Sequence, residues 1–201
     1  MSLNYEVIYK SIKNINSENR EIYDDFIKLL IDKKGEKGKN TLSYKFNDIW
    51  HCNDIGRCDN FFKIDRMVIH LLLQLKTLEE KGFCLLFLQA SDIIVINDEL
   101  YLLANLSQMV PLYKKNKSQF RLVCPTIYPF PSEMCAPELL EMKLLPFISH
   151  SSASYYSLAL LCLTLLKRIN LSLDDLQGTK LYYFLNRCLK KDPNERLCLY
   201  F

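Results

Sequence analysis

Hydrophobic residues recur at steps of three and four along several stretches of the chain, which is the spacing of amphipathic helices. The first stretch contains Tyr5, Ile8, Ile12 and Ile15. A second follows Ser17, a possible N-cap, with apolar positions at Ile22, Phe26, Leu29 and Leu30. The strongest pattern runs from Lys63 to Lys81, with apolar positions at Ile64, Val68, Leu71, Leu72, Leu75 and Leu78. We predict a helix over each stretch, with Lys81-Gly82 ending the third.

Two more helices are predicted in the last third of the chain. The segment from Ser154 to Lys167 is apolar almost all round, which is typical of a helix at the centre of a domain. The segment from about Thr179 to Lys190 has one apolar face, and Asp192-Pro193 follows as a stop.

Strand patterns are rarer. Ile93 to Ile96 and Leu100 to Leu103 flank the polar pair Asn97-Asp98, which predicts a hairpin. The region from Asn105 to Met134 contains several prolines, and we predict a long loop there. Residues 41–62 give no clear element. The predicted fold class is mainly α (α+β), with helices around one small hairpin.

Composition narrows the range of partners. A chain of 201 residues suits one domain, and its net charge of +3 is too small to argue for nucleic acid. Its longest apolar stretch, residues 155–166, is shorter than the roughly 20 residues that cross a membrane. The start of the chain does not resemble a secretory signal. Cys84, Cys162 and Cys188 stand in apolar runs, as reduced cysteines do. We therefore expect an intracellular, cytoplasmic protein with neither a nucleic-acid nor a membrane partner.

One group of residues has zinc-ligand chemistry. His51, Cys52, Cys58 and the more distant His70 could in principle bind the metal. However, no C-x-x-C pair is present, and the spacing between Cys52 and Cys58 is not a usual knuckle. We expect no metal site and no cofactor.

Three motifs near the C-terminus carry the most specific signal. Cys135-Ala136-Pro137-Glu138 precedes the apolar segment Tyr155–Leu161, and the segment Arg187–Arg196 reads R-C-L-K-K-D-P-N-E-R. Their order and spacing resemble the C-terminal lobe of eukaryotic-type Ser/Thr protein kinases. The resemblance covers roughly residues 63–201 and leaves 1–62 as a reduced N-terminal lobe or its helical replacement. In composition the chain looks similar to divergent kinase-like proteins of large DNA viruses.

The resemblance also assigns the catalytic positions. The metal-binding Asn falls on Asp92, the catalytic base on Phe87, and the D-F-G motif on Asn105-Leu106-Ser107. A phenyl ring cannot accept a proton, and the apolar run Leu85–Leu88 would seal the cavity. No glycine-rich phosphate loop precedes the long helix, so no ATP site is expected.

Other family positions are structural. The A-P-E glutamate of these kinases pairs with a buried arginine, and here the two are Glu138 and Arg196, so the resemblance implies a structural ion pair. The chain also departs from the family pattern. The acid expected near the start of the buried helix is Ser154, and the Trp-like position is Tyr156. Ten residues separate Lys167 from Gly178, too few for the helix and loop expected there.

The leading hypothesis is a catalytically inactive kinase-like domain (a pseudokinase) that binds another protein as a scaffold or competitor. Candidate surfaces are the segment from Cys124 to Pro131 and the aromatic stretch from Tyr44 to Phe62. One alternative is an active, atypical phosphotransferase, in which Asp92, Asn105 and either Asp98 or Glu99 converge on a metal. The other is a helical adaptor unrelated to kinases, in which Glu138 and Arg196 would not touch.

Overall fold

The computed structural model describes residues 6–12, 15, 17–35, 48–52, 59–116, 119–124, 133–142, 144–198 and 200. Its helices are α1 (Glu6–Ser11), α2 (Ser17–Gly35), α3 (Phe61–Glu80), α4 (Pro137–Leu140), α5 (Ala153–Arg168) and α6 (Lys180–Cys188). Single 3-10 turns are η1 (Ala90–Asp92), η2 (Asp174–Leu176) and η3 (Pro193–Glu195). The strands are β1 (Ile49–His51), β2 (Phe83–Leu85), β3 (Ile93–Ile96), β4 (Leu100–Leu103), β5 (Met109–Asn116), β6 (Gln119–Cys124) and β7 (Phe147–His150). The fold is therefore α+β.

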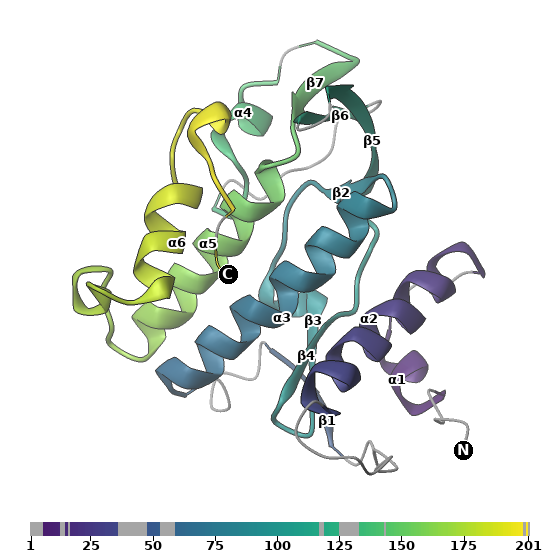
Figure 1. Cartoon of the computed structure of the whole chain (residues 1–201), viewed down its shortest axis with the longest axis vertical. Coiled ribbons are helices and arrows are strands. Elements are labelled where there is room, and N and C mark those ends of the chain that lie inside the picture. Colours follow the sequence, from purple (N-terminus) through teal and green to yellow (C-terminus); the bar gives the residue numbers. More distant parts are fainter. Residues whose placement is uncertain are drawn as a thin grey trace.

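The strands form two antiparallel sheets. The smaller has the order β1-β3-β4, and the larger has the order β2-β5-β6-β7. Figure 1 shows α3 and α5 running through the middle of the molecule, with α6 on one side and α1 and α2 on the other. The N-terminal helix α2 packs against both α3 and β4.

One large hydrophobic core joins nearly all of these elements. It takes apolar side chains from α1, α2, α3, the β3–β4 hairpin, α5 and α6. A second, smaller cluster, called here the second cluster, contains Cys84, Leu86, Phe87, Val110, Cys135, Ala136, Leu139 and Ala153. Residues on both sides of the boundary expected near residue 62 thus share one core.

The helices predicted from periodicity are present. The third begins two residues earlier than expected because Asn60 caps it, its Oδ1 accepting from the Lys63 N–H at 3.0 Å. It ends at Glu80, and Gly82 takes a φ of 83° just beyond. Thr179 caps α6 in the same way as Asn60, through the Tyr182 N–H. The capping hydrogen bonds and the spacing of apolar residues together determine where α3 and α6 begin.

The predicted hairpin is also present. Asn97 and Asp98 have φ values of 53° and 57°, and the Glu99 N–H donates to the Ile96 carbonyl at 3.1 Å. Asn and Asp tolerate this left-handed backbone better than other side chains. Beside the hairpin, the fully buried Gln74 of α3 donates to the Tyr101 carbonyl and accepts from the Leu103 N–H, at 2.8 and 2.9 Å. The Gln74 side-chain amide therefore hydrogen-bonds backbone groups of β4 and links α3 to the small sheet.

The long loop expected from Asn105 to Met134 is wrong, and so is the expectation of a single hairpin. Strands β5 and β6 occupy much of that stretch, and β7 adds a further strand after α4. Pro111 lies within β5 opposite Phe83 of β2, and the next residue, Leu112, donates to the Gly82 carbonyl at 2.8 Å. A proline at this position removes one backbone hydrogen-bond donor from β5 but does not prevent the strand from forming.

The described cysteines Cys52, Cys84, Cys135, Cys162, Cys188 and Cys198 are free thiols, as their apolar settings suggested. Within the described part of the chain, no helix is both long and apolar enough to cross a bilayer.

Candidate functional site

The hairpin brings two of the predicted site residues together. Asp92 directly precedes β3, and Asn105 comes two residues after β4. The Asn105 side-chain amide donates to Asp92 Oδ1 at 2.8 Å, and the Ala104 N–H donates to the Asp92 carbonyl at 2.6 Å. Asp92 and Asn105 are called the polar pair below.

The remaining oxygens of the polar pair also have partners. Asp92 Oδ2 accepts from the Gln89 N–H at 3.0 Å, and Asn105 Oδ1 accepts from the Ser107 N–H at 3.0 Å. Asp92 is only 4% exposed. Both of these donors to the Asp92 carboxylate are neutral, and a metal ion at this point would have to displace hydrogen bonds that are already made.

Tyr23 of α2 lies near Asp92 of the polar pair. Its side chain is 1% exposed, and its hydroxyl is close to the backbone of Leu106, the residue after Asn105. Burial raises the pKa of this hydroxyl well above its ordinary value, and the nearby Asp92 carboxylate raises it further. The phenol therefore stays protonated beside Asp92. Periodicity marked α2 as a helix but gave no signal that Tyr23 would meet this site.

The segment just before Asp92 consists of buried apolar side chains. Leu85, Leu86, Phe87 and Leu88 are all buried. Phe87, which stands where the resemblance puts the catalytic base, belongs to the second cluster together with Ala136 and Leu139 at the A-P-E segment. Phe87 therefore packs in an apolar cluster, and its ring cannot accept a proton.

Ser157 of α5 holds the backbone of this segment. Its Oγ accepts from the Leu88 N–H at 2.8 Å and lies 3.2 Å from the Leu88 carbonyl, to which it can donate. Ser154, the position singled out from the sequence, instead donates to the Ser151 carbonyl at 3.1 Å. The sequence analysis missed Ser157, although a buried serine on an otherwise apolar helix is itself a signal of a polar partner.

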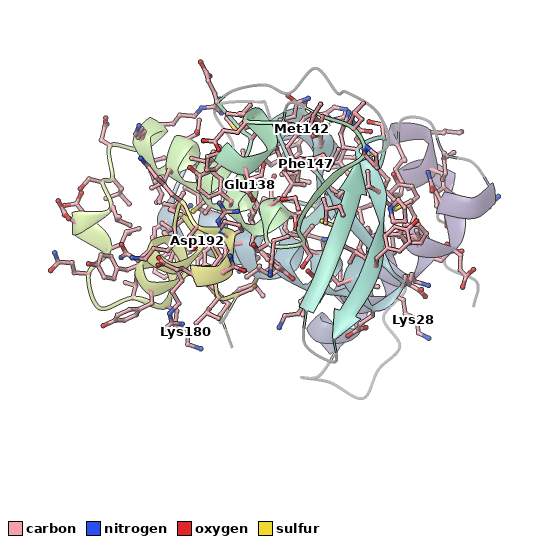
Figure 2. All side chains as sticks on the ribbon, turned by 90° about the horizontal axis from the view of Figure 1, so that it is seen from above. Lys28, Glu138, Met142, Phe147, Lys180 and Asp192 are labelled. Carbon is pink, nitrogen blue, oxygen red and sulfur yellow. The ribbon has the colours of Figure 1, made fainter. Side chains whose placement is uncertain are left out.

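The structural ion pair is present. Arg196 donates through both terminal nitrogens to Glu138, at 2.6 Å to Oε1 and 2.7 Å to Oε2. The same guanidinium donates to the Lys190 and Lys191 carbonyls at 2.7 and 2.9 Å. Its carbon lies 4.6 Å from the centre of the Tyr156 ring, a cation–π distance. Figure 2 shows Glu138 near Asp192, far from Lys28 of α2.

This arrangement makes Arg196 a junction of three elements. Glu138 comes from α4, Tyr156 from α5, and the two carbonyls from the end of the α6 segment. Nearby, the Ser152 hydroxyl donates to the Pro193 carbonyl at 3.1 Å. The contact contradicts the expectation attached to an unrelated helical adaptor, in which Glu138 and Arg196 would lie apart.

Glu79, near the end of α3, is a further carboxylate with a neutral hydrogen-bond donor. The Tyr155 hydroxyl donates to its Oε2 at 2.8 Å. Burial raises the pKa of Glu79, although Tyr155, the nearby Ser151 side chain and the positive charge of Lys76 oppose the change.

The acids at the hairpin turn do not join the polar pair. Asp98 and Glu99 lie beyond the far end of β3, roughly 13 Å from Asp92 for four extended residues. Asp98 accepts from the Trp50 indole at 2.7 Å. The convergence that an atypical phosphotransferase would need is therefore wrong for these acids.

The other candidate regions are only partly described. Residues 36–47, 53–58 and 125–132 lie outside the described residues, and with them Tyr44 and Phe46 of the aromatic stretch and Cys58 of the zinc group. Of the aromatic stretch, Trp50 is buried while Phe62 is 77% exposed. His70 Nδ1 accepts from the Tyr101 N–H at 3.2 Å. The described residues contain no cluster of three or more metal-ligating side chains.

No model of a known protein family matches this chain, and no curated protein matches it in sequence.

Proposed function

We propose that this protein is a kinase-like domain that has lost phosphoryl transfer and acts by binding another protein. The order of its elements supports this: a long helix, a hairpin, α4 at Ala136-Pro137-Glu138, a buried helix, and the D-P-x-x-R segment. The bidentate contact between Glu138 and Arg196 joins two of these motifs in space. The free cysteines favour a reducing, intracellular setting.

The observation that best supports a loss of phosphoryl transfer is the set of hydrogen bonds made by the polar pair. Phosphoryl transfer depends on metal ions and charged groups placed around the phosphates. Here Asp92 is bonded to neutral donors, Asn105 has replaced a carboxylate, and Phe87 has replaced the base. Of these three described positions, only Asp92 carries a charge that could bind a metal–nucleotide complex.

A row of exposed apolar side chains is the surface that we propose for the partner. It runs from α4 to β7 and consists of Leu140, Leu144, Leu145 and Ile148, with Leu144 82% exposed. Among the described strands β7 is one of the two outer strands of its sheet, the other being β2. An outer strand offers backbone donors and acceptors, so an extended segment of another protein suits this edge.

The first experiment is a thermal-shift titration of the purified protein with ATP and Mg²⁺ or Mn²⁺. A ligand at 100 times its dissociation constant stabilises a fold by about 2.7 kcal/mol, which a melting curve resolves. We expect no metal-dependent shift. A shift that requires both nucleotide and metal would contradict the proposal and favour the atypical phosphotransferase instead.

The second experiment tests the surface. We expect a Leu144→Asp, Ile148→Asp variant to melt like the unaltered protein, because both side chains are exposed, but to lose the partners that the unaltered protein captures. Phe62→Asp is the matched control, since Phe62 lies on the other candidate surface. If Phe62→Asp abolishes capture and the double variant does not, the aromatic stretch is the binding surface.

A further inference from the structure

The hairpin formed by β5 and β6 concentrates the positive charge of the chain. Residues 113–121, called here the basic hairpin, contain four bases and no acid: Lys114, Lys115, Lys117 and Arg121. No aspartate or glutamate occurs anywhere from Leu100 to Ser132. The four bases exceed the net charge of +3 of the whole chain, so the remaining residues together carry a net charge of −1. The small overall charge therefore conceals one strongly positive segment.

The end of the basic hairpin extends beyond the strands on either side of it. Strand β7 pairs with β6 as far as His150, which lies opposite Arg121. On the other side, β2 pairs with β5 no further than Pro111. Strand β5 nevertheless continues to Asn116, and β6 begins at Gln119. The hairpin thus projects past His150 by three residues of β5, or about 10 Å of extended chain. Figure 1 shows β5, β6 and β7 together at the top of the molecule.

Bases stand on both faces of this projecting end. Arg121 is opposite Tyr113 in the register, and Lys114 is opposite Phe120. Because neighbouring positions of a strand belong to opposite faces, Arg121 and Lys114 are on different faces of the hairpin. Tyr113 is 59% exposed, so the face that it shares with Arg121 is open to solvent at this position. A chain that passes along the edge can meet positive charge from either face.

The basic hairpin continues the surface proposed for the partner. Ile148 of the exposed apolar row lies in β7, two residues before His150. An extended segment that pairs with the outer edge of β7 and continues past His150 comes alongside the projecting end of the hairpin. It would lie two strand spacings from β6, or about 10 Å, which long charged side chains can bridge. This separation is also about one Debye length at 0.1 M salt.

We propose that the partner segment has two halves: an apolar half that pairs with β7 and an acidic half that passes the basic hairpin. The pairs between neighbouring strands of this sheet are antiparallel, so the start of an added antiparallel segment lies beside His150. The acidic residues therefore precede the apolar ones in the partner's sequence. This inference rests on the proposed function, because it takes the same strand edge and adds the chemistry of the segment.

A polynucleotide fits the basic hairpin less well than an acidic protein segment. A protein that binds duplex DNA tightly commonly contacts about six to ten phosphates. The hairpin has four bases, and the rest of the chain has a net charge of −1, so no wider positive surface adds to them. Pairing with the β7 backbone also requires a polypeptide.

Three labelled peptides test the charge and the order of the segment. Each contains the run threonine-valine-threonine-valine-threonine, preceded by four glutamates, preceded by four lysines, or followed by four glutamates. At about 50 mM salt, we expect the peptide that begins with glutamates to bind the unaltered protein at least about tenfold more tightly than the lysine peptide. The measurement is fluorescence anisotropy. The peptide that ends with glutamates should lose most of this advantage, and about 0.5 M salt should reduce it for both.

These titrations need no variant, so they can overturn the inference on the unaltered protein alone. Equal or tighter binding of the lysine peptide overturns it, and so does equal binding of the two glutamate peptides. No binding of any peptide up to about 1 mM overturns it as well. A DNA duplex is the fourth probe, and a duplex that binds more tightly than every peptide would identify a polynucleotide partner instead.

Two matched variants locate the charge effect. Lys114→Gln, Lys115→Gln removes two bases of the hairpin, whereas Lys167→Gln, Arg168→Gln removes two exposed bases in the last turn of α5. We expect the hairpin variant to bind the peptide that begins with glutamates at least about threefold more weakly and the lysine peptide no more weakly. The α5 variant should change neither affinity. A hairpin variant with unchanged affinity for the glutamate peptide overturns the inference.

The outcomes separate this inference from the proposed function. If the peptides show no charge preference but Leu144→Asp, Ile148→Asp weakens the binding of all three, the acidic half is wrong and the proposed surface stands. If that double variant leaves every affinity unchanged, the proposed surface is wrong even where a charge preference remains. A metal-dependent ATP shift would contradict the loss of phosphoryl transfer and is measured without any peptide.

Discussion

Two carboxylates of this protein, Glu138 and Asp92, have opposite surroundings. Glu138 faces a guanidinium that makes two short hydrogen bonds to it. Asp92 faces an asparagine amide and a backbone N–H, both neutral. Glu138 joins elements that are far apart in the sequence, whereas the hydrogen bonds of the Asp92 carboxylate with Gln89 and Asn105 stay within its own hairpin region.

The difference separates a structural role from a chemical one. A buried ion pair is costly to break because one charge is left without its partner, so both partners are kept together. Asp92 instead accepts from neutral donors, so removing one of them leaves no second charge without a partner. The second cluster lies between the two regions and packs Phe87 against the segment that carries Glu138.

The largest effect is expected from breaking the ion pair. Arg196→Met leaves Glu138 without a cation and frees the Lys190 and Lys191 carbonyls. We expect the free energy of unfolding to fall by about 3–5 kcal/mol, measured by chemical denaturation. Arg168→Met, an exposed arginine in the last turn of α5, is the control and should cost less than about 1 kcal/mol.

A double variant makes this test specific to charge. Adding Glu138→Gln to Arg196→Met removes the uncompensated carboxylate and should recover part of the loss. If Arg196→Met alone costs under about 1 kcal/mol, the pair does not have the structural role described here.

A smaller effect is expected from adding charge to the polar pair. Asn105→Asp replaces the amide that donates to Asp92 by a second carboxylate, which repels the first. We expect a loss of about 1–3 kcal/mol at pH 7. The pKa of the coupled carboxylates would be raised in the folded state, so stability should recover as the pH falls and one of them binds a proton.

The same substitution at an exposed site provides the control. Asn170 is exposed with a φ of 58°, a conformation that aspartate also tolerates, so Asn170→Asp should change stability by no more than about 0.5 kcal/mol. Equal effects at the two positions would mean that Asp92 is not charged in the folded protein.

The smallest effect concerns Glu79, which accepts a hydrogen bond from a neutral donor, the Tyr155 hydroxyl. Its pKa is raised above the ordinary 4.5 in the folded state, so its protonated form is favoured there. The corresponding stability is present below the unfolded pKa and is lost as the pH rises through the folded pKa. Glu79→Gln keeps an acceptor for the Tyr155 hydroxyl and should remove this loss.

We therefore expect Glu79→Gln to gain on the unaltered protein as the pH rises from about 4.5, in denaturation curves measured at several pH values. Glu141→Gln, at an exposed position after α4, should run parallel to the unaltered protein. A constant difference between Glu79→Gln and the unaltered protein at every pH would contradict the prediction.

Local sequence signals were enough to predict the elements that have a clear hydrophobic period together with a cap or a turn. Asn60 and Thr179 begin their helices by hydrogen bonds within three residues, and Asn97-Asp98 closes the hairpin. Strands β5 and β6 were missed because Pro111 was interpreted as a loop residue. Their stability comes from pairing with β2 and β7, which are distant in sequence.

The candidate site was predictable to a similar extent. Asp92 and Asn105 flank one hairpin, so their proximity follows from the turn. The pairing of Glu138 with Arg196 required a resemblance that joined two distant motifs. Neither source could place Tyr23, because no local pattern specifies which sheet edge the apolar face of α2 will meet.

The hydrogen bond between Trp50 and Asp98 has a practical consequence for optical spectroscopy. Trp50 is the only tryptophan of the chain, and its buried indole lies on β1 and donates to the hairpin turn. Its emission therefore reports on the small sheet alone, while far-ultraviolet circular dichroism reports mainly on the helices. If the two signals change at different denaturant concentrations, the sheet and the helices unfold in separate steps.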